Sequence, residues 1–313
     1  MLNSKNGETA SVGARVPCIR SFLGNLQSSG IENTMTFFEK RAGKIFFVCF
    51  LFLFALLLPS IASAEWETGA KIGFDSNIDR AIDNEKSDTY LGAYLSFLRN
   101  PSGESRVDWT LAATLEGSLF LRLEDLSYGA FTLAPGITLI PHRVWTINIS
   151  PFFQAKGLGD SDQSALAYGA KLSMRQQIGK DVYTGQYYIY KDSRAEKDVY
   201  SFIENALGVY VGKNWSQTFY TEIGYEYSHG DSFRSFGSSA PSGFGRGKQR
   251  RFSSTFDREV IKEKVDRHSI GISAGFDWTK SLFSTINYNY TALEGDSGSS
   301  SSHSGFISLG YRF

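Results

Sequence analysis

The last nine residues of the chain, Gly305 to Phe313, alternate apolar side chains with small or polar ones and end on an aromatic residue. One set holds Ile307, Leu309, Tyr311 and Phe313, and the other holds Ser308, Gly310 and Arg312. Successive side chains of a β-strand point to opposite faces, so this segment is predicted to be a strand with one apolar and one polar face. A strand that ends at the chain terminus without a cap is suited to closing a barrel in lipid.

The same alternation recurs about twelve times, with connections that are alternately short and longer. The expected strands lie near 66–75, 88–98, 106–120, 127–140, 144–156, 164–178, 182–192, 200–212, 217–228, 267–278, 282–293 and 304–313. An even strand number places both ends of a bacterial barrel in the periplasm and the longer loops outside. We therefore predict an all-β fold, an antiparallel transmembrane β-barrel of about 12 strands over residues 65–313.

The segment before residue 65 has the layout of an export signal. Lys40, Arg41 and Lys44 precede an apolar run over residues 45–58, and small residues over 59–64 suit cleavage. The apolar run holds about 14 residues, whereas a transmembrane helix needs roughly 20. We expect residues 1–64 to be an N-terminal extension and a cleaved signal peptide, with Met1 and Met35 as alternative translation starts.

Removing that segment changes the composition in two useful ways. Both cysteines, Cys18 and Cys49, fall within it, so neither a disulfide nor a cysteine metal site is expected in the mature chain. The whole chain balances 32 basic against 32 acidic residues, and the mature part keeps 26 and 29. This balance points to no nucleic-acid partner.

A soluble β-sandwich would alternate as well, so the tryptophans matter more than the alternation does. All five lie close to a predicted short turn or to the mature N-terminus: Trp66, Trp109, Trp145, Trp215 and Trp278. Indole rings favour the membrane interface, so five at one level indicate an aromatic belt. Tyr227, Tyr290 and Phe74 are expected in the opposite belt.

Charged residues on the polar faces are expected to line the lumen. They are Glu67, Lys71, Glu116, Lys171, Arg175, Glu204, Glu222, Glu226 and Arg312. The cations of the sixth strand and the acids of the eighth and ninth could form opposite walls of a pore. Alternatively, the charges could form a salt-bridge network that fills the barrel, because twelve strands lie between packed small barrels and wide porins.

The longest connection, 229–266, is expected to be an outer loop rich in glycine and serine. It carries a basic patch of Arg246, Lys248, Arg250 and Arg251 that could bind lipopolysaccharide phosphates. Its phenylalanines favour docking on another surface over full exposure to solvent. A solvated, mobile loop remains the alternative.

Catalytic and metal sites are weakly indicated. His229 with Asp231, or His303 with the serines at 299–302, could serve an outer-membrane hydrolase, but no hydrolase signature surrounds them. The segment 75–79 begins like a calcium loop, yet Arg80 stands where glycine is needed. We expect no enzyme activity, no cofactor and no metal site.

The leader, the alternating body and the terminal strand together resemble Gram-negative outer-membrane β-barrel proteins over residues 65–313. The segment 72–80 is similar to the opening of export-associated barrels such as surface-lipoprotein assembly modifiers. The resemblance implies that the barrel-assembly machinery reads Ile307, Leu309, Tyr311 and Phe313, and that any periplasmic partner domain comes from another chain. The expected function is a passive channel for small polar solutes or the pore of an export system. The alternative is a packed barrel whose outer loops bind lipopolysaccharide or a partner.

Overall fold

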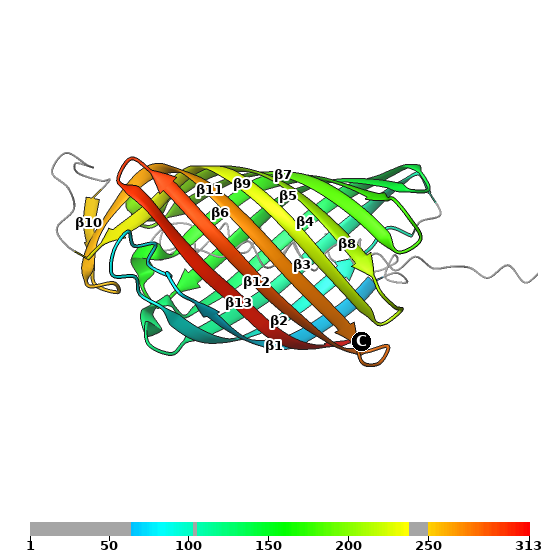
Figure 1. The fold of residues 1–313 in the computed structure, drawn as a ribbon, viewed down its shortest axis with the longest axis horizontal. Coiled ribbons are helices and arrows are strands. Elements are labelled where there is room, and N and C mark those ends of the chain that lie inside the picture. Colours follow the sequence, from blue (N-terminus) through cyan, green and yellow to red (C-terminus); the bar gives the residue numbers. More distant parts are fainter. Residues whose placement is uncertain (1–63, 103–104, 238–249) are drawn as a thin grey trace, which may run out of the picture.

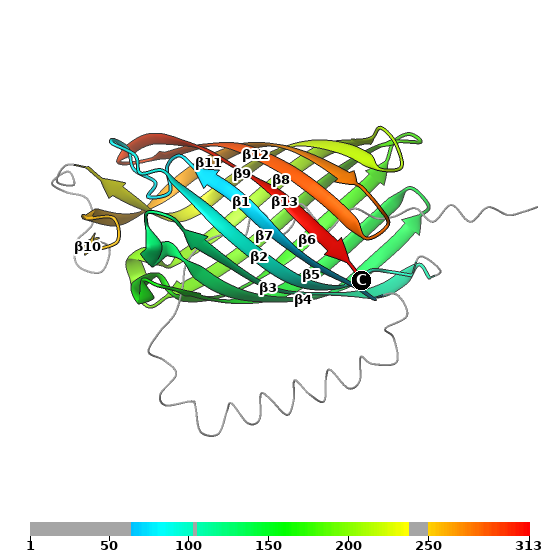
Figure 2. The same cartoon turned by 90° about the horizontal axis from the view of Figure 1, so that it is seen from below.

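The protein is a closed antiparallel β-barrel, seen from the side in Figure 1 and after a quarter turn in Figure 2. The computed structural model describes residues 64–102, 105–237 and 250–313. Twelve strands make the wall, and a short extra strand, β10, pairs with β11 beyond one end of it. The predicted fold class and the strand number of the wall are therefore confirmed. The predicted signal peptide lies outside the described residues except for Ala64, which begins β1.

The strand bounds follow the alternating segments closely at one end of the barrel. The strands are β1 (Ala64–Asp75), β2 (Asp88–Arg99), β3 (Val107–Phe120), β4 (Tyr128–His142), β5 (Trp145–Leu158), β6 (Ala165–Gln177), β7 (Val182–Ala195), β8 (Phe202–Asn214), β9 (Phe219–Phe236), β10 (Arg250–Ser253), β11 (Arg258–Asp277), β12 (Leu282–Gly295) and β13 (Gly298–Arg312). Three 3-10 turns interrupt the connections: η3 (Glu124–Leu126), η4 (Ser161–Gln163) and η5 (Asp198–Tyr200). In the described ranges, no helix is long and apolar enough to cross a membrane.

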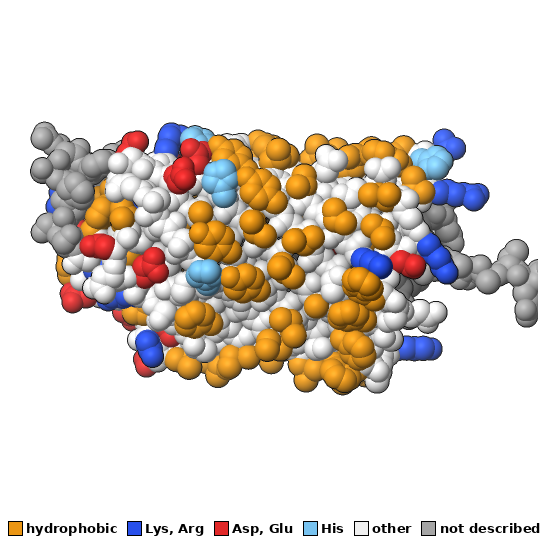
Figure 3. Space-filling view, viewed as in Figure 1, with side chains coloured by type: hydrophobic (Ala, Val, Ile, Leu, Met, Phe, Trp, Pro, Cys, Tyr) orange, Lys and Arg blue, Asp and Glu red, His pale blue; other side chains and the backbone are white. Residues whose placement is uncertain are grey.

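The outer surface carries the apolar face of every strand. On β13, Ile307 and Leu309 are 55% and 54% exposed, whereas Ser308 between them is 6% exposed. Figure 3 shows the result, a broad band of hydrophobic side chains around the middle with charged side chains gathered at both ends. In water such a band would be unfavourable, but in a bilayer it matches the hydrocarbon core.

The barrel closes where β1 pairs with β13, as predicted for the first and last strands. Glu67 is directly across from Arg312, and the Arg312 Nε donates to Glu67 Oε1 at 2.8 Å. The backbone N–H of Phe313 also donates to the carbonyl of Trp66 at 3.0 Å. Both chain ends of the barrel therefore lie at one end, called here the terminal end, and the opposite end is called the loop end.

The predicted aromatic belts lie on the outer surface. Each tryptophan is within three residues of a strand boundary at the terminal end, and Trp66, Trp215 and Trp278 are exposed. Two indole N–H groups reach a hydroxyl on the next strand, Trp215 to Thr221 and Trp278 to Ser284. Phe74, Tyr227 and Tyr290 are exposed nearer the loop end, as expected of the opposite belt.

Two predicted loops are wrong, because strands continue through them. Strand β9 reaches Phe236 and β11 begins at Arg258, so much of the expected 229–266 loop is a hairpin in regular register. Likewise, β12 and β13 are joined by a turn at 296–297, and the serines at 299–302 lie inside β13. Polar composition had suggested loops there, but beyond the membrane a strand can be polar on both faces.

Candidate functional site

The predicted lumen residues all occupy strand positions on the face opposite the exposed apolar side chains. Glu222, for example, precedes the exposed Ile223, and Glu226 lies between the exposed Tyr225 and Tyr227. Lys71 precedes the exposed Ile72 in the same way. The lumen therefore gathers these charged groups, while their role in permeation stays a prediction.

Several of the charges are paired along the lumen face, mostly between strands that are separated by one other strand. Lys71 lies 3.4 Å from Glu116. Arg267, which was not singled out in the sequence, lies 2.7 Å from Glu204. Arg312 joins the closing strands by contacting Glu67 at 2.8 Å and Asp277 at 3.1 Å. These pairs fix side chains against the wall, because a buried charge is tolerated when it is paired and hydrogen-bonded.

The expected opposite walls of cations and acids are not present. Strands β6 and β9 are separated only by β7 and β8, so their charges lie on the same part of the wall. Tyrosines of β7 stand between them. Arg175 lies 3.9 Å from the ring centroid of Tyr183, whose hydroxyl donates to Glu222 at 3.3 Å. The alternation along single strands does not predict this arrangement, because Tyr183 and Glu222 lie on β7 and β9, which are separated by β8.

A second cation, tyrosine and acid set repeats four residues along. Lys171 lies 4.9 Å from the ring centroid of Tyr187, and the Tyr187 hydroxyl donates to Glu226 at 2.7 Å. The two sets explain why the seventh predicted strand carries so many tyrosines. Its Tyr183 and Tyr187 face the lumen, whereas Tyr188 is exposed on the outside.

Eight inward aromatic rings rest against glycines of the wall. Each of eight rings sits over a glycine directly across on the next strand. The pairs are Tyr90 with Gly73, Tyr94 with Gly69, Phe152 with Gly169, Tyr183 with Gly212, Tyr187 with Gly208, Tyr210 with Gly185, Tyr220 with Gly275 and Phe283 with Gly310. A Cβ added at Gly185 would lie 2.1 Å from Tyr210 Cζ. The missing side chain at each glycine is what lets the ring rest on the backbone.

Two lysines on the lumen face are buried without a carboxylate partner among the described residues. Lys156 is 7% exposed, and its ammonium lies 3.9 Å from the ring centroid of Tyr128. Lys191 is 4% exposed and donates to Gln154 Oε1 at 3.2 Å. Sequence reasoning did not select either residue, although both sit on the polar face of a predicted strand.

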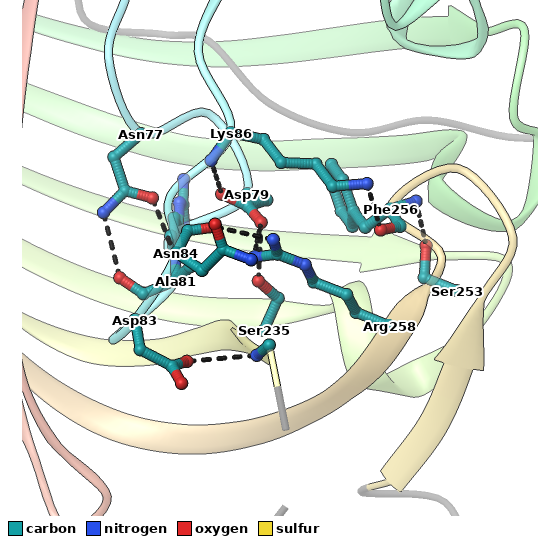
Figure 4. A network of polar contacts seen from close by, with 12 residues as sticks. Asn77, Asp79, Ala81, Asp83, Asn84, Lys86, Ser235, Ser253, Phe256 and Arg258 are labelled. Atoms are coloured by element: carbon teal, nitrogen blue, oxygen red, sulfur yellow. Dashed lines mark hydrogen bonds and ion pairs between the residues drawn. The ribbon is translucent and has the colours of Figure 1, made fainter. Parts of the chain in front are cut away.

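The loop between β1 and β2 folds over the mouth at the loop end (Figure 4). The fully buried Asp79 accepts hydrogen bonds from the Arg258 guanidinium at 2.8 Å and from Ser235 at 2.9 Å. Asn77 is held by Ala81 and by the carbonyl of Ser301. In the segment 75–79, which begins like a calcium loop, Asp79 is therefore bound to a guanidinium in an ion pair.

A cavity of about 240 Å³ lies beneath this loop. Asn77, Ile78 and Arg80 of the loop line it, together with Lys156, Glu226 and Arg267 of the wall. The Arg80 guanidinium lies 4.8 Å from the ring centroid of Phe233 and donates to Ser232 at 2.7 Å. Desolvation, reinforced by the positive charge of Arg267, lowers the pKa of Arg80 to about 9.

The loops at the same end share a small apolar core. Its buried members are Leu126, Val199, Tyr200, Phe233, Phe256 and Val260. Phe233 stacks on Phe256 with ring centroids 5.8 Å apart, so these two phenylalanines dock on the protein's own loops. This core narrows the mouth and holds the loops in fixed positions.

The predicted basic patch is only partly visible. Arg246 and Lys248 lie outside the described residues. Arg250 forms an ion pair with Glu259, and Arg251 forms one with Asp162. Both described arginines are therefore engaged within the protein, and binding to lipopolysaccharide stays a prediction.

The two histidine pairings weighed for a hydrolase do not form. His229 contacts Asp266 at 2.9 Å, while Asp231 faces Lys262 and Lys264. The ring of His303 contacts the Tyr288 hydroxyl at 2.7 Å rather than a serine. These side chains lie on the lipid-facing side of their strands, away from the lumen.

Comparison with known proteins bears on the fold. No family model and no curated protein matches the chain. An outer membrane channel from Pseudomonas putida F1 is similar over 80% of this chain and 96% of its own, with a TM-score of 0.58 and 8% identity. The KdgM porin in complex with disordered oligogalacturonate covers 79% and 99% (TM-score 0.46, 10% identity), and the NanC porin covers 78% and 98% (TM-score 0.46, 11% identity). The chain thus has the porin-like fold of bacterial outer-membrane barrels.

Proposed function

We propose that this protein is a passive outer-membrane channel for small polar solutes. The observation that carries the proposal is the polar inner face of the barrel, where charged side chains lie opposite the exposed apolar ones. Eight inward aromatic rings rest against glycines of neighbouring strands on this face. The paired charges support the same reading, because Lys71, Arg267 and Arg312 are held at the wall by carboxylates.

Reconstitution into planar bilayers tests the proposal directly. We expect stepwise ion conductance from barrel that is folded, as judged by a heat-modifiable shift on a denaturing gel. Folded barrel that inserts and never conducts would refute the channel. The pore of an export system is the second form of the same proposal, and it would need a periplasmic partner chain.

A packed barrel that binds a partner or lipopolysaccharide is the rival. It is favoured by the complete burial of small polar side chains on the lumen face, such as Ser96 and Ser118, and by the apolar core at the mouth. Substituting Lys171, Arg175, Glu204 and Glu222 separates the two functions. A pore is expected to change its ion selectivity, whereas a packed network is expected to lose stability and to have no conductance to alter.

The similar Pseudomonas putida F1 protein is described as an outer membrane channel, and we propose that this chain likewise acts without enzyme activity. Activity against lipid or peptide that is lost on changing His229, His268 or His303 would contradict this. The exposed positions of His229 and His303 on the outer surface offer no enclosed site for a substrate.

A further inference from the structure

We propose that Lys156 and Lys191 form an anion-binding site in the lumen, which takes the carboxylate or phosphate group of a small solute. The inference deepens the proposed channel function and rests on it for the direction of transport. Binding itself can be tested whether or not the barrel conducts. The juxtaposition behind it is two buried ammonium groups on β5 and β7 that both face the lumen and interact electrostatically.

The acids nearest to the two lysines are already engaged. Glu204 is directly across from Lys191 on β8, but its carboxylate is bound by Arg267 at 2.7 Å and by Ser228 at 2.7 Å. Glu116 interacts electrostatically with Lys156, yet its ion pair at 3.4 Å is with Lys71. Among the residues that the structure describes, no carboxylate therefore lies at contact distance from either ammonium group.

Two buried ammonium groups that also repel one another are unfavourable unless something compensates them. In membrane proteins, ionisable residues without an evident structural partner mark pathways for ions and substrates. Lys156 and Lys191 interact electrostatically, and Arg80 adds to the positive field at Lys156. A bound anion would relieve this repulsion, which is the physical reason for placing the site here.

Gln154 holds Lys191 against the wall close to the strand that carries Lys156. It precedes Lys156 on the same face of β5, and its side-chain amide donates to Thr132 at 3.1 Å. That bond directs Oε1 toward Lys191, which donates to it at 3.2 Å. Through Gly169 of β6, the strand register places Lys191 level with Phe152 of β5. Lys191 therefore lies deeper in the lumen than Lys156, which lines the cavity beneath the mouth.

Acids elsewhere around the cavity set the limits of the site. Asp75 accepts from Ser302 at 2.6 Å, and Glu226 accepts from Tyr187 at 2.7 Å. Both lie on other strands, β1 and β9, so they repel an anion from that part of the wall and leave the β5 and β7 part as its path. An entering anion would meet Lys156 first and Lys191 second.

The decisive measurement is the chloride-to-potassium permeability ratio of reconstituted barrel under a KCl gradient. We expect the native protein to favour chloride, and we expect the variant with both Lys156→Gln and Lys191→Gln to lower the ratio by roughly tenfold. Replacing both lysines by arginine should restore most of it. Lys262→Gln is the matched control, since this lysine pairs with Asp198 and Asp231 on the outside of the hairpin and should leave the ratio unchanged.

Titration calorimetry on detergent-folded barrel with inorganic phosphate in one arm and acetate in the other measures binding separately. We expect at least one of these anions to bind and to lose its binding in the double glutamine variant. Barrel that binds without conducting would support the site and refute the channel. Barrel that conducts with the same permeability ratio in native and double variant would refute the site and leave the channel standing.

Discussion

The absence of a side chain at glycine determines where the eight lumen rings can lie. Glycine presents only hydrogen at the α-carbon, so the Tyr210 ring approaches the backbone of Gly185 closely enough to lie flat. The same applies to Tyr187 over Gly208. The free width of the lumen therefore depends on small residues of the wall as much as on the large ones.

We expect Gly185→Val to lower the single-channel conductance, because the added side chain pushes the Tyr210 ring toward the axis. Overpacking of this kind costs about 1–3 kcal/mol of stability. The matched control is Gly157→Val on β5, where an added Cβ meets nothing within 4 Å. Equal conductance for the two variants would show that ring position does not set the pore width.

The Tyr187 hydroxyl is expected to stabilise the lumen through Glu226. Tyr187→Phe removes the donor at 2.7 Å and leaves a carboxylate of the lumen short of a partner, at a cost of about 1–3 kcal/mol. Urea unfolding of detergent-folded barrel measures the loss. The neighbouring Tyr188→Phe removes an exposed hydrogen bond to Asn205 and should cost less. A larger loss for Tyr188→Phe would contradict this account of the lumen.

At the scale of elements, alternation predicted which face of each strand is buried but not where strands end at the loop end. The hairpin of β9 and β11 continues past the apolar band, and there Asp231, Lys262 and Lys264 pair across strands. The glycine and serine content of 229–266 predicts a loop, because a strand beyond the membrane needs no apolar face and so shows no alternation. Pairing between strands and cross-strand ion pairs maintain the extension, and neither can be read from one strand alone.

The lumen contacts were predictable only in part, for a related reason. The nine charged positions follow from alternation along single strands, whereas their partners depend on registers between strands. The pairing of Glu67 with Arg312 was inferred because closure of the barrel fixes it. The contact between Arg175 and Tyr183 could have been sought from inward glycines across from tyrosines, a pattern that the sequence does contain.

The loop over the mouth depends on one buried ion pair. Asp79→Ala leaves the Arg258 guanidinium without its carboxylate, and removing one partner of such a pair costs about 3–5 kcal/mol. We expect the 76–87 loop to detach while the barrel stays folded, so trypsin should cut at Arg80 or Lys86 much faster in the variant. Asp83→Ala is the control, since the one hydrogen bond that Asp83 accepts from the described residues comes from the exposed N–H of Gly237. Unchanged cleavage in Asp79→Ala would show that other contacts hold the loop.

At the scale of the whole molecule, stability depends on one seam. The wall contains eleven pairs of strands that follow one another along the chain, if β9 and β11 are counted as consecutive across the short β10. The twelfth pair, β1 with β13, joins the two ends of the barrel. Arg312 holds this seam from inside by contacting Glu67 on the neighbouring strand β1 and Asp277 on β11, which is separated from β13 by β12. The terminal strand is thus a closing element as well as the proposed signal for the barrel-assembly machinery.

We expect Arg312→Ala to lower the temperature at which the barrel loses its compact form on a denaturing gel. Three acids, Glu65, Glu67 and Asp277, lose a shared cation, and the expected cost is a few kcal/mol, on the order of that for breaking a buried pair. Arg143→Ala, in an exposed turn at the same end, removes the same charge away from the seam and should leave the transition in place. A seam that tolerates the loss of Arg312 would mean that backbone pairing alone keeps the barrel closed.

The rings that rest on glycines also bear on how such a protein can change over generations. Adding a side chain at such a glycine is unfavourable on its own, and so is a change that leaves the ring without its glycine. Exchanging both residues together avoids both costs. Tyr183 and Gly212 should therefore be inherited as a unit, although they lie on different strands. Descendants of this chain would differ from it by whole pairs, and each exchange would widen or narrow the passage in one step.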